Sequence, residues 1–274
     1  MTTPDSGERS PELERLTGLA EQLGLRIDDA KQRGIAGNTV GIRSDNLLFS
    51  QRLDSRTYFV QNSAFGTGRG ADYGGSDADL LAECDAVAAR LEIPRDEIGA
   101  RDVVQEYTQV ASFHGGTGIA APEPVERGVR YGRLRRTING HPVWNSSCLL
   151  GLTSDGGIGH LLLHWPEVPA TVIDEVDALA ARLDNGWKDP GCEAAQLESV
   201  HAGTLHSPAV GSVMEFRAVI RAIYAPRTPG IGRKPVRYLD IAGRDVMKPR
   251  THVWDLERMP PRQGERVSGP RETE

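Results

Sequence analysis

Several residue types and patterns are scarce in this 274-residue sequence, and each scarcity excludes a class of protein. Its three cysteines, Cys84, Cys148 and Cys192, argue against a disulfide-stabilised fold and for a reducing compartment. It lacks an apolar run of the roughly 18 residues that a membrane-spanning helix needs. Its first ten residues are polar and lack the apolar segment of a secretory signal. We therefore expect a cytoplasmic protein with no membrane partner.

Lysine is also scarce, because only Lys31, Lys188, Lys234 and Lys248 contribute to the 32 basic residues. The 38 acidic residues give a net charge of −6, and aromatic residues make up 5% of the chain. An acidic chain with few aromatic residues argues against nucleic acid as a partner. Positive charge is carried mainly by arginine, so the places where arginines gather on one element are informative.

The pattern along the chain predicts two folded units between two polar tails. Residues 1–10 and 255–274 are rich in polar residues and proline, without apolar periodicity, and are expected to be disordered. The first unit is expected over residues 11–165 and the second over residues 166–254. Each is expected to begin with a helix and continue with strands.

The first unit contains two helix signals. Ser10 followed by Pro11 is a good helix start, and the apolar spacing that follows predicts a helix ending near Gly34. Ser76 and Asp77 cap a second helix that Pro94 ends. Between the two helices, residues 39–49 and 57–65 read as a hairpin.

Strands follow the second helix of this unit, at about residues 102–113, 127–138, 142–153 and 158–165. Asn139-Gly140 and Asp155-Gly156 are strong signals for short hairpin turns. Three consecutive strands are therefore expected to form an antiparallel meander.

The second unit repeats this order with one helix over residues 169–184. Strands are expected at about 196–206, 212–224 and 235–243. Helices followed by runs of strands, without βαβ alternation, predict an α+β fold with antiparallel sheets.

The stretch from Arg135 through Asn139-Gly140 to Val143, with the later strand that ends at His164-Trp165-Pro166, resembles the hairpin of PepSY-type propeptide modules. The resemblance covers residues 77–165, with a weaker second copy over 169–243. It implies cystatin-like topology, in which one helix packs on a curled antiparallel meander. It implies no particular activity.

The glycine-rich segment 66–75 precedes the second helix, whose N-terminus could accept an anion with help from Arg69. Its spacing, Gly66-x-Gly68-x-Gly70, misses the dinucleotide-binding pattern. A loop for a substrate phosphate or carboxylate and an irregular connection both remain open. We expect no nucleotide cofactor.

Two residues near the strand at 102–113 are candidate acid/base groups. Alternation places Glu106 on a half-apolar strand face, where the pKa of a carboxyl can be raised. His114 follows beside two glycines and could act from a loop. A solvent-facing glutamate at a sheet edge is the alternative for Glu106.

Arginines gather on the next strand, at positions 127, 130, 133, 135 and 136. Arg133 and Arg135 share one face and could hold an anionic substrate, because guanidinium groups bind carboxylates and phosphates bidentately. An edge strand protected by charge explains the same pattern.

The strand at 212–224 alternates an apolar face with one that carries Glu215, Arg217 and Arg221. That second face also contains valine and isoleucine, so a ligand, a dimer partner or another layer is expected to cover it. Glu215 is a candidate catalytic group, and Arg217 and Arg221 are candidate substrate-binding groups. Asp240, on the neighbouring strand, could join them.

No metal site is expected. His160 and His164 lie on a predicted strand, where four residues span about 13 Å, so one ion cannot bridge them. Cys148 is expected to be a buried structural cysteine.

Two functions remain open from the sequence. The first is a cofactor-independent enzyme of specialised metabolism, in which a strand carboxylate acts as acid or base on an anionic substrate in a cyclisation or condensation of Pictet–Spengler type. The second is a non-catalytic binding or assembly protein that docks a partner through an arginine-bearing sheet face. A homodimer is compatible with both.

Overall fold

The computed structural model describes residues 10–27, 32–63, 65, 73–108, 113–114, 118–119, 126–188, 197–208, 214–225 and 236–246. The two predicted tails lie outside these ranges apart from Ser10. Of the predicted site residues, Arg69 lies outside them, and so does the side chain of His114.

Local sequence signals set the helix starts. The α-helices are α1 (Pro11–Gln22), α2 (Asp77–Arg90) and α3 (Ala170–Asp184), and a short 3-10 helix, η1, spans Arg95–Glu97. The Ser10 side chain caps α1 by accepting from the Glu12 N–H at 3.2 Å, as predicted. The predicted end near Gly34 is wrong, because Gly24 turns the chain at φ +70 and the Leu25 N–H bonds the Ala20 carbonyl at 2.9 Å.

Most of the predicted strand segments are strands in the structure, but one of them contains two strands. The predicted strand 39–49 is two strands, separated by a turn at residues 44–46. The strands are β1 (Gln32–Ala36), β2 (Thr39–Arg43), β3 (Leu47–Arg52), β4 (Thr57–Asn62), β5 (Ile98–Thr108), β6 (Phe113–His114), β7 (Gly118–Ile119), β8 (Glu126–Ile138), β9 (His141–Leu152), β10 (Ile158–His164), β11 (Leu197–Pro208), β12 (Met214–Tyr224) and β13 (Val236–Leu239).

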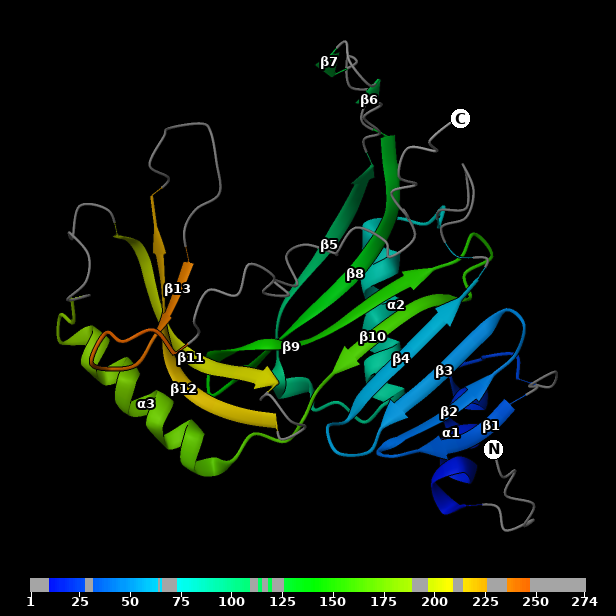
Figure 1. Cartoon of the computed structure of the whole chain (residues 1–274), viewed down its shortest axis with the longest axis horizontal. Helices are drawn as coiled ribbons and strands as arrows, with labels where there is room; N and C mark the ends of the chain where they lie inside the picture. The colour runs from blue at the N-terminus through cyan, green and yellow to red at the C-terminus, as the bar shows by residue number, and fades with distance from the viewer. Residues whose placement is uncertain are drawn as a thin grey trace, which may run out of the picture.

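Eleven of these strands form one large mixed sheet (Figure 1). Its main path is β1-β2-β3-β4-β10-β9-β11-β12-β13, and β8 pairs with both β9 and β5. In the described ladders the neighbours run antiparallel except β9 and β11, which pair in parallel at Val143 and Trp144. Asn139 and Gly140 have φ values of +52 and +81, which confirms the predicted two-residue turn between β8 and β9.

The helices lie against the sheet in two places. α1 packs on β1 to β3 and α2 on β5, β8 and β9, and these elements enclose the largest apolar core, around Leu16, Leu80 and Leu150. α3 packs on β11 and β12 over a smaller core that includes Ile220 and Tyr224. Figure 1 shows α2 behind the central strands and α3 beside β11 and β12.

The predicted fold class is wrong. The chain is a mostly-sheet protein with three short helices in its described part, not a pair of PepSY- or cystatin-like α+β units that each join a helix to its own meander. The physical reason is long-range pairing. β4 bonds to β10, and β9 bonds to β11, so strands from separate segments join one sheet. The proposed boundary at residue 165 stays a prediction.

Within the described ranges, none of the helices is long and apolar enough to cross a membrane.

Candidate functional site

A cavity of about 100 Å³ lies where β8, β9, β12 and β13 come together, and arginine is its most frequent lining residue. Three arginines come from β8 and one from β12. The lining residues are Arg133, Arg135, Arg136, Pro142, Val143, Trp144, Asn145, Ser146, Ser147, Arg221 and Tyr238. We call this cavity the arginine pocket.

A bend in β9 creates the pocket. The first part of β9 pairs with β11 at Val143 and Trp144, whereas residues 147–152 pair with β10. Between these parts, Asn145 has a φ of +65, a left-handed conformation in which asparagine is less strained than most residues. The register with β8 also shifts between Arg135 and Thr137. The bend separates the two partners of β9, and the arginines of β8 lie beside it.

Arg133 and Arg135 share a carboxylate from the neighbouring strand β5. The buried Arg133 donates to Asp102 through Nε, at 2.8 Å, and through a terminal nitrogen, while Arg135 donates to the same carboxylate at 3.2 Å. The hydrogen bond from Arg133 lowers the pKa of Asp102, which therefore stays ionised. Asp102 fixes both guanidinium groups and balances one of their two charges.

Arg136 points to a different set of partners and is 4% exposed. Its Nε donates to Glu97 at 2.8 Å, its guanidinium lies 5.2 Å from the centre of the Trp165 ring, and a terminal nitrogen donates to the Pro166 carbonyl. Trp165 Nε1 donates to the same Glu97 oxygen at 2.7 Å. Burial lowers the pKa of Arg136. Arg136 therefore joins β8 to η1 and to the end of β10.

The opposite wall is aromatic. The Arg221 guanidinium lies 5.9 Å from the centre of the Trp144 ring, a cation–π contact. The Trp144 and Tyr238 rings meet edge to face, with centroids 5.6 Å apart. These contacts hold three side chains from β9, β12 and β13 in one group.

The lining is strongly positive. It contains four guanidinium groups and no carboxylate, while Asp102 and Glu97 contact three of the arginines from outside the lining. Such a pocket can bind a carboxylate or a phosphate, and its described lining holds no acidic or histidine side chain for proton transfer.

The structure brings together three of the predicted anion-binding residues, Arg133, Arg135 and Arg221, which come from two strands. Arg217 does not join them. It pairs with Glu215 at 2.6 Å, and both side chains are about half exposed, at 52% and 49%.

Asp240 also has a local role. It accepts from the backbone N–H groups of Ala242 and Arg244, each at 2.9 Å, and pairs with the Arg244 side chain at 2.6 Å. These bonds close the turn after β13, and Asp240 does not line the arginine pocket.

The predicted catalytic residues do not converge in the described part of the chain. Glu106 lies half-buried at a bulge in β5, packed over Gly128, whereas Glu215 lies near the start of β12 in a distant part of the sheet (Figure 1). Neither lines the arginine pocket. The side chain of His114 lies outside the described residues.

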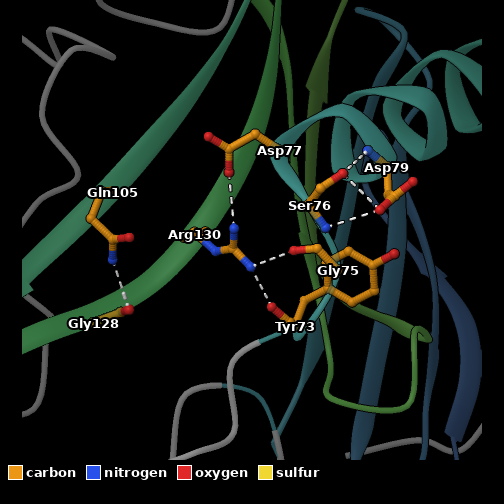
Figure 2. Close-up of polar contacts among 8 residues, drawn as sticks. All are labelled: Tyr73, Gly75, Ser76, Asp77, Asp79, Gln105, Gly128 and Arg130. Atoms are coloured by element: carbon orange, nitrogen blue, oxygen red, sulfur yellow. Dashed lines mark hydrogen bonds and ion pairs between the residues drawn. The ribbon is translucent and has the colours of Figure 1, made fainter.

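Carboxylates of the chain itself lie at the N-terminus of α2 (Figure 2). Ser76 and Asp79 form a capping box, in which the Asp79 carboxylate accepts from the Ser76 N–H at 2.9 Å. Arg130 of β8 also reaches this segment, where it donates to Asp77 and to the Tyr73 and Gly75 carbonyls. The predicted role of Arg69 falls outside the described residues, but these carboxylates compete with a substrate anion at the helix end.

Sequence reasoning did not single out Trp144 and Tyr238 as members of the site. Tyr238 follows Arg237, and Trp144 precedes three polar residues. Neither pattern indicates that the two rings meet, because each strand taken alone shows an isolated aromatic residue.

No family model matches the chain, and a search of curated proteins also finds no match. A solved structure of an uncharacterized protein from Eubacterium rectale is similar at 11% identity and a TM-score of 0.39, covering 88% of this chain and 83% of that one. The resemblance to PepSY modules is not tested by these comparisons.

Proposed function

We propose that this chain is a binding protein that holds the carboxylate or phosphate of a small anionic ligand in the arginine pocket. The observation that carries the proposal is a lining with four arginines and no carboxylate. Guanidinium groups match the geometry of both anions, and a partly enclosed site strengthens the interaction.

The fixed positions of the arginines support this function. Asp102 holds Arg133 and Arg135, while Trp144 lies under Arg221. A ligand therefore meets side chains that are already placed, which reduces the entropy that binding costs.

The volume and the aromatic lining of the arginine pocket limit the kind of ligand that it can hold. A cavity of about 100 Å³ is smaller than the roughly 300–1,000 Å³ of typical small-molecule sites, so it suits an anionic group with a few further atoms. Trp144 and Tyr238 offer an apolar surface to the atoms that adjoin the charge.

Acid/base catalysis of a cyclisation or condensation stays a prediction from the sequence. Glu106 and Glu215 lie outside the arginine pocket, so binding without chemistry is the function that this geometry supports best. A cytoplasmic location and a homodimer also stay proposals, the first supported by the low number of cysteines.

The test is isothermal titration of the purified protein with benzoate, phenyl phosphate and uncharged benzamide. We expect the two anions to bind and benzamide to bind at least about tenfold more weakly, a difference of about 1.4 kcal/mol. Arg221→Met should weaken anion binding by a similar factor.

Arg217→Met is the matched control, because Arg217 lies on the same strand but outside the pocket. It should leave anion binding unchanged. Equal binding of benzoate and benzamide, or equal losses in the two arginine variants, would overturn the proposal. Circular dichroism of each variant verifies that the sheet is intact.

A further inference from the structure

A second and larger cavity, of about 920 Å³, lies in a different part of the sheet. Three chain reversals border it: the segment after α1, the turn between β2 and β3, and the turn between β9 and β10. We call it the turn groove. Its volume falls in the range of sites that bind whole small molecules.

Pairing of the strands brings these reversals together. Leu47 at the start of β3 lies opposite Asn62 at the end of β4, and β4 pairs with β10 through Gln61 and His160. The β9–β10 turn therefore lies next to the β2–β3 turn, although about a hundred residues separate them in the sequence.

Two of these borders are held by hydrogen-bonded turns that contain a glycine with positive φ. Gly24, at φ +70, ends α1 and turns the chain so that Leu25 is buried and Arg26 exposed. In the β9–β10 turn, Gly156 has a φ of +83 and the Gly156 N–H bonds the Thr153 carbonyl at 2.9 Å. The groove is thus bordered by closed turns, which hold their side chains in place.

The polar lining is rich in uncharged groups. Ser44 and Ser154 contribute hydroxyl groups, and Asn46 and Asn62 contribute carboxamides. The Ser44 hydroxyl already accepts from the Leu47 N–H at 3.1 Å, and the Thr153 hydroxyl donates within its own turn, to Asp155 and to the Gly157 carbonyl. The Asn46 amide oxygen accepts from the Ser63 hydroxyl at 3.1 Å, so the amide nitrogen is the end of that side chain that remains as a donor.

The charges of the lining cancel. Arg26 and Asp155 are its charged members, one of each sign. The hydrogen bond from Thr153 lowers the pKa of Asp155, so this carboxylate is an ionised acceptor at neutral pH. Leu25, Leu47 and Ile158, each at least nine-tenths buried, supply an aliphatic floor.

We propose that the turn groove binds a neutral saccharide. A sugar presents vicinal hydroxyl groups that both donate and accept, and the amides, hydroxyls and carboxylate of the lining match both roles. Its C–H groups can rest on the aliphatic floor. A lining without net charge gives an ionic ligand no advantage, in contrast to the arginine pocket.

The test is an NMR titration of the isotope-labelled protein, in which amide chemical shifts are measured as maltotriose, cellotriose or xylotriose is added at millimolar concentration. At least one trisaccharide should shift the signals of residues 24–26, 44–47 and 153–158 in a saturable manner. The signals of Arg133 and Arg221 should not move, which separates this site from the proposed anion site.

Ser154→Arg places a large side chain at the groove while removing no hydrogen bond recorded between described residues. It should weaken saccharide binding by about tenfold or more. Thr171→Arg adds the same side chain at an exposed position on α3 and should leave binding unchanged.

Absence of saturable shifts with all three trisaccharides would overturn the proposal, and so would unchanged binding by Ser154→Arg. An N-acetylated Gly-Ser-Gly amide serves as a neutral peptide probe. Saturable shifts with this peptide and none with the saccharides would also overturn it, by assigning the groove to a peptide.

Discussion

Replacing Arg136 by alanine should destabilise the fold strongly, although this arginine lies beside the proposed ligand. The change removes a side chain that is 4% exposed and that contacts Glu97, Trp165 and the Pro166 carbonyl. In the variant, the Trp165 indole N–H still donates a hydrogen bond to Glu97, but the charge of that carboxylate has lost its arginine partner. The expected effect is on the free energy of unfolding of the whole protein.

The magnitude follows from burial. Removing one partner of a buried ion pair costs about 3–5 kcal/mol. The Glu97 side chain is 24% exposed, so water can solvate part of its charge in the variant, and we expect the lower end, about 3 kcal/mol. For a chain of this size that loss lowers Tm by about 6–12 °C.

Urea unfolding, followed by tryptophan fluorescence, measures this loss as a change of midpoint at constant slope. Arg101→Ala is the control, because its pair with Asp85 is exposed on both sides, at 39% and 43%, and should contribute at most about 1 kcal/mol. The double variant Arg136→Met with Glu97→Gln should lose less than the sum of the single variants. A loss below about 1 kcal/mol for Arg136→Ala, or strict additivity of the pair, would refute the reasoning.

Three further changes follow from the packing. Gly203→Ala places a methyl group 2.8 Å from the Trp144 ring at the β9–β11 junction, and should lower the urea midpoint by the equivalent of about 2 kcal/mol; an unchanged midpoint would contradict this close approach. Burial raises the pKa of Cys84 to about 12 and the pKa of Cys148 well above its usual value. Neither thiol should therefore react with Ellman's reagent at neutral pH until the protein unfolds. Rapid labelling of either cysteine in the native protein would contradict this. Burial lowers the pKa of His160 to about 4, whereas in the unfolded chain this imidazole takes up its proton near pH 6.5. The free energy of unfolding should therefore fall as pH drops from 6.5 towards 4, by at most about 3 kcal/mol. His160→Gln should remove that part of the pH dependence, which urea unfolding at several pH values measures.

Local features of the fold were predictable because residues a few positions apart determine them. Ser76 caps α2 through the Asp79 N–H, and Asn139-Gly140 adopts the positive φ values that its turn requires. The burial of Cys148 is confirmed as well, since it is fully buried on β9. The cap and the turn depend on side chains and backbone groups that the sequence places next to each other.

Partners of the strands were not predictable in the same way. An alternating apolar pattern shows which face of β4 is buried, but not which strand bonds to its edge. The sequence therefore predicted two separate helix-plus-meander units, whereas β9 of the first unit pairs with β11 of the second.

The same distinction applies to the site. Arg133 and Arg135 were predicted to share a face because two positions separate them on one strand, and both line the pocket. Their meeting with Trp144 and Tyr238 depends on the bend at Asn145 and on the pairing of distant strands. No pattern within one strand encodes that meeting.

The pairing of β4 with β10 also has a consequence for synthesis on the ribosome. The strands β1 to β4 can pair as soon as residue 62 has emerged, but β4 then has one unpaired edge until residues 158–164 follow. At roughly 5–20 residues per second, that edge is exposed for several seconds. During this interval it can bond to another nascent chain, so slow translation between the two strands favours aggregation. The order of the strands thus makes the yield of folded protein depend on the speed of its synthesis.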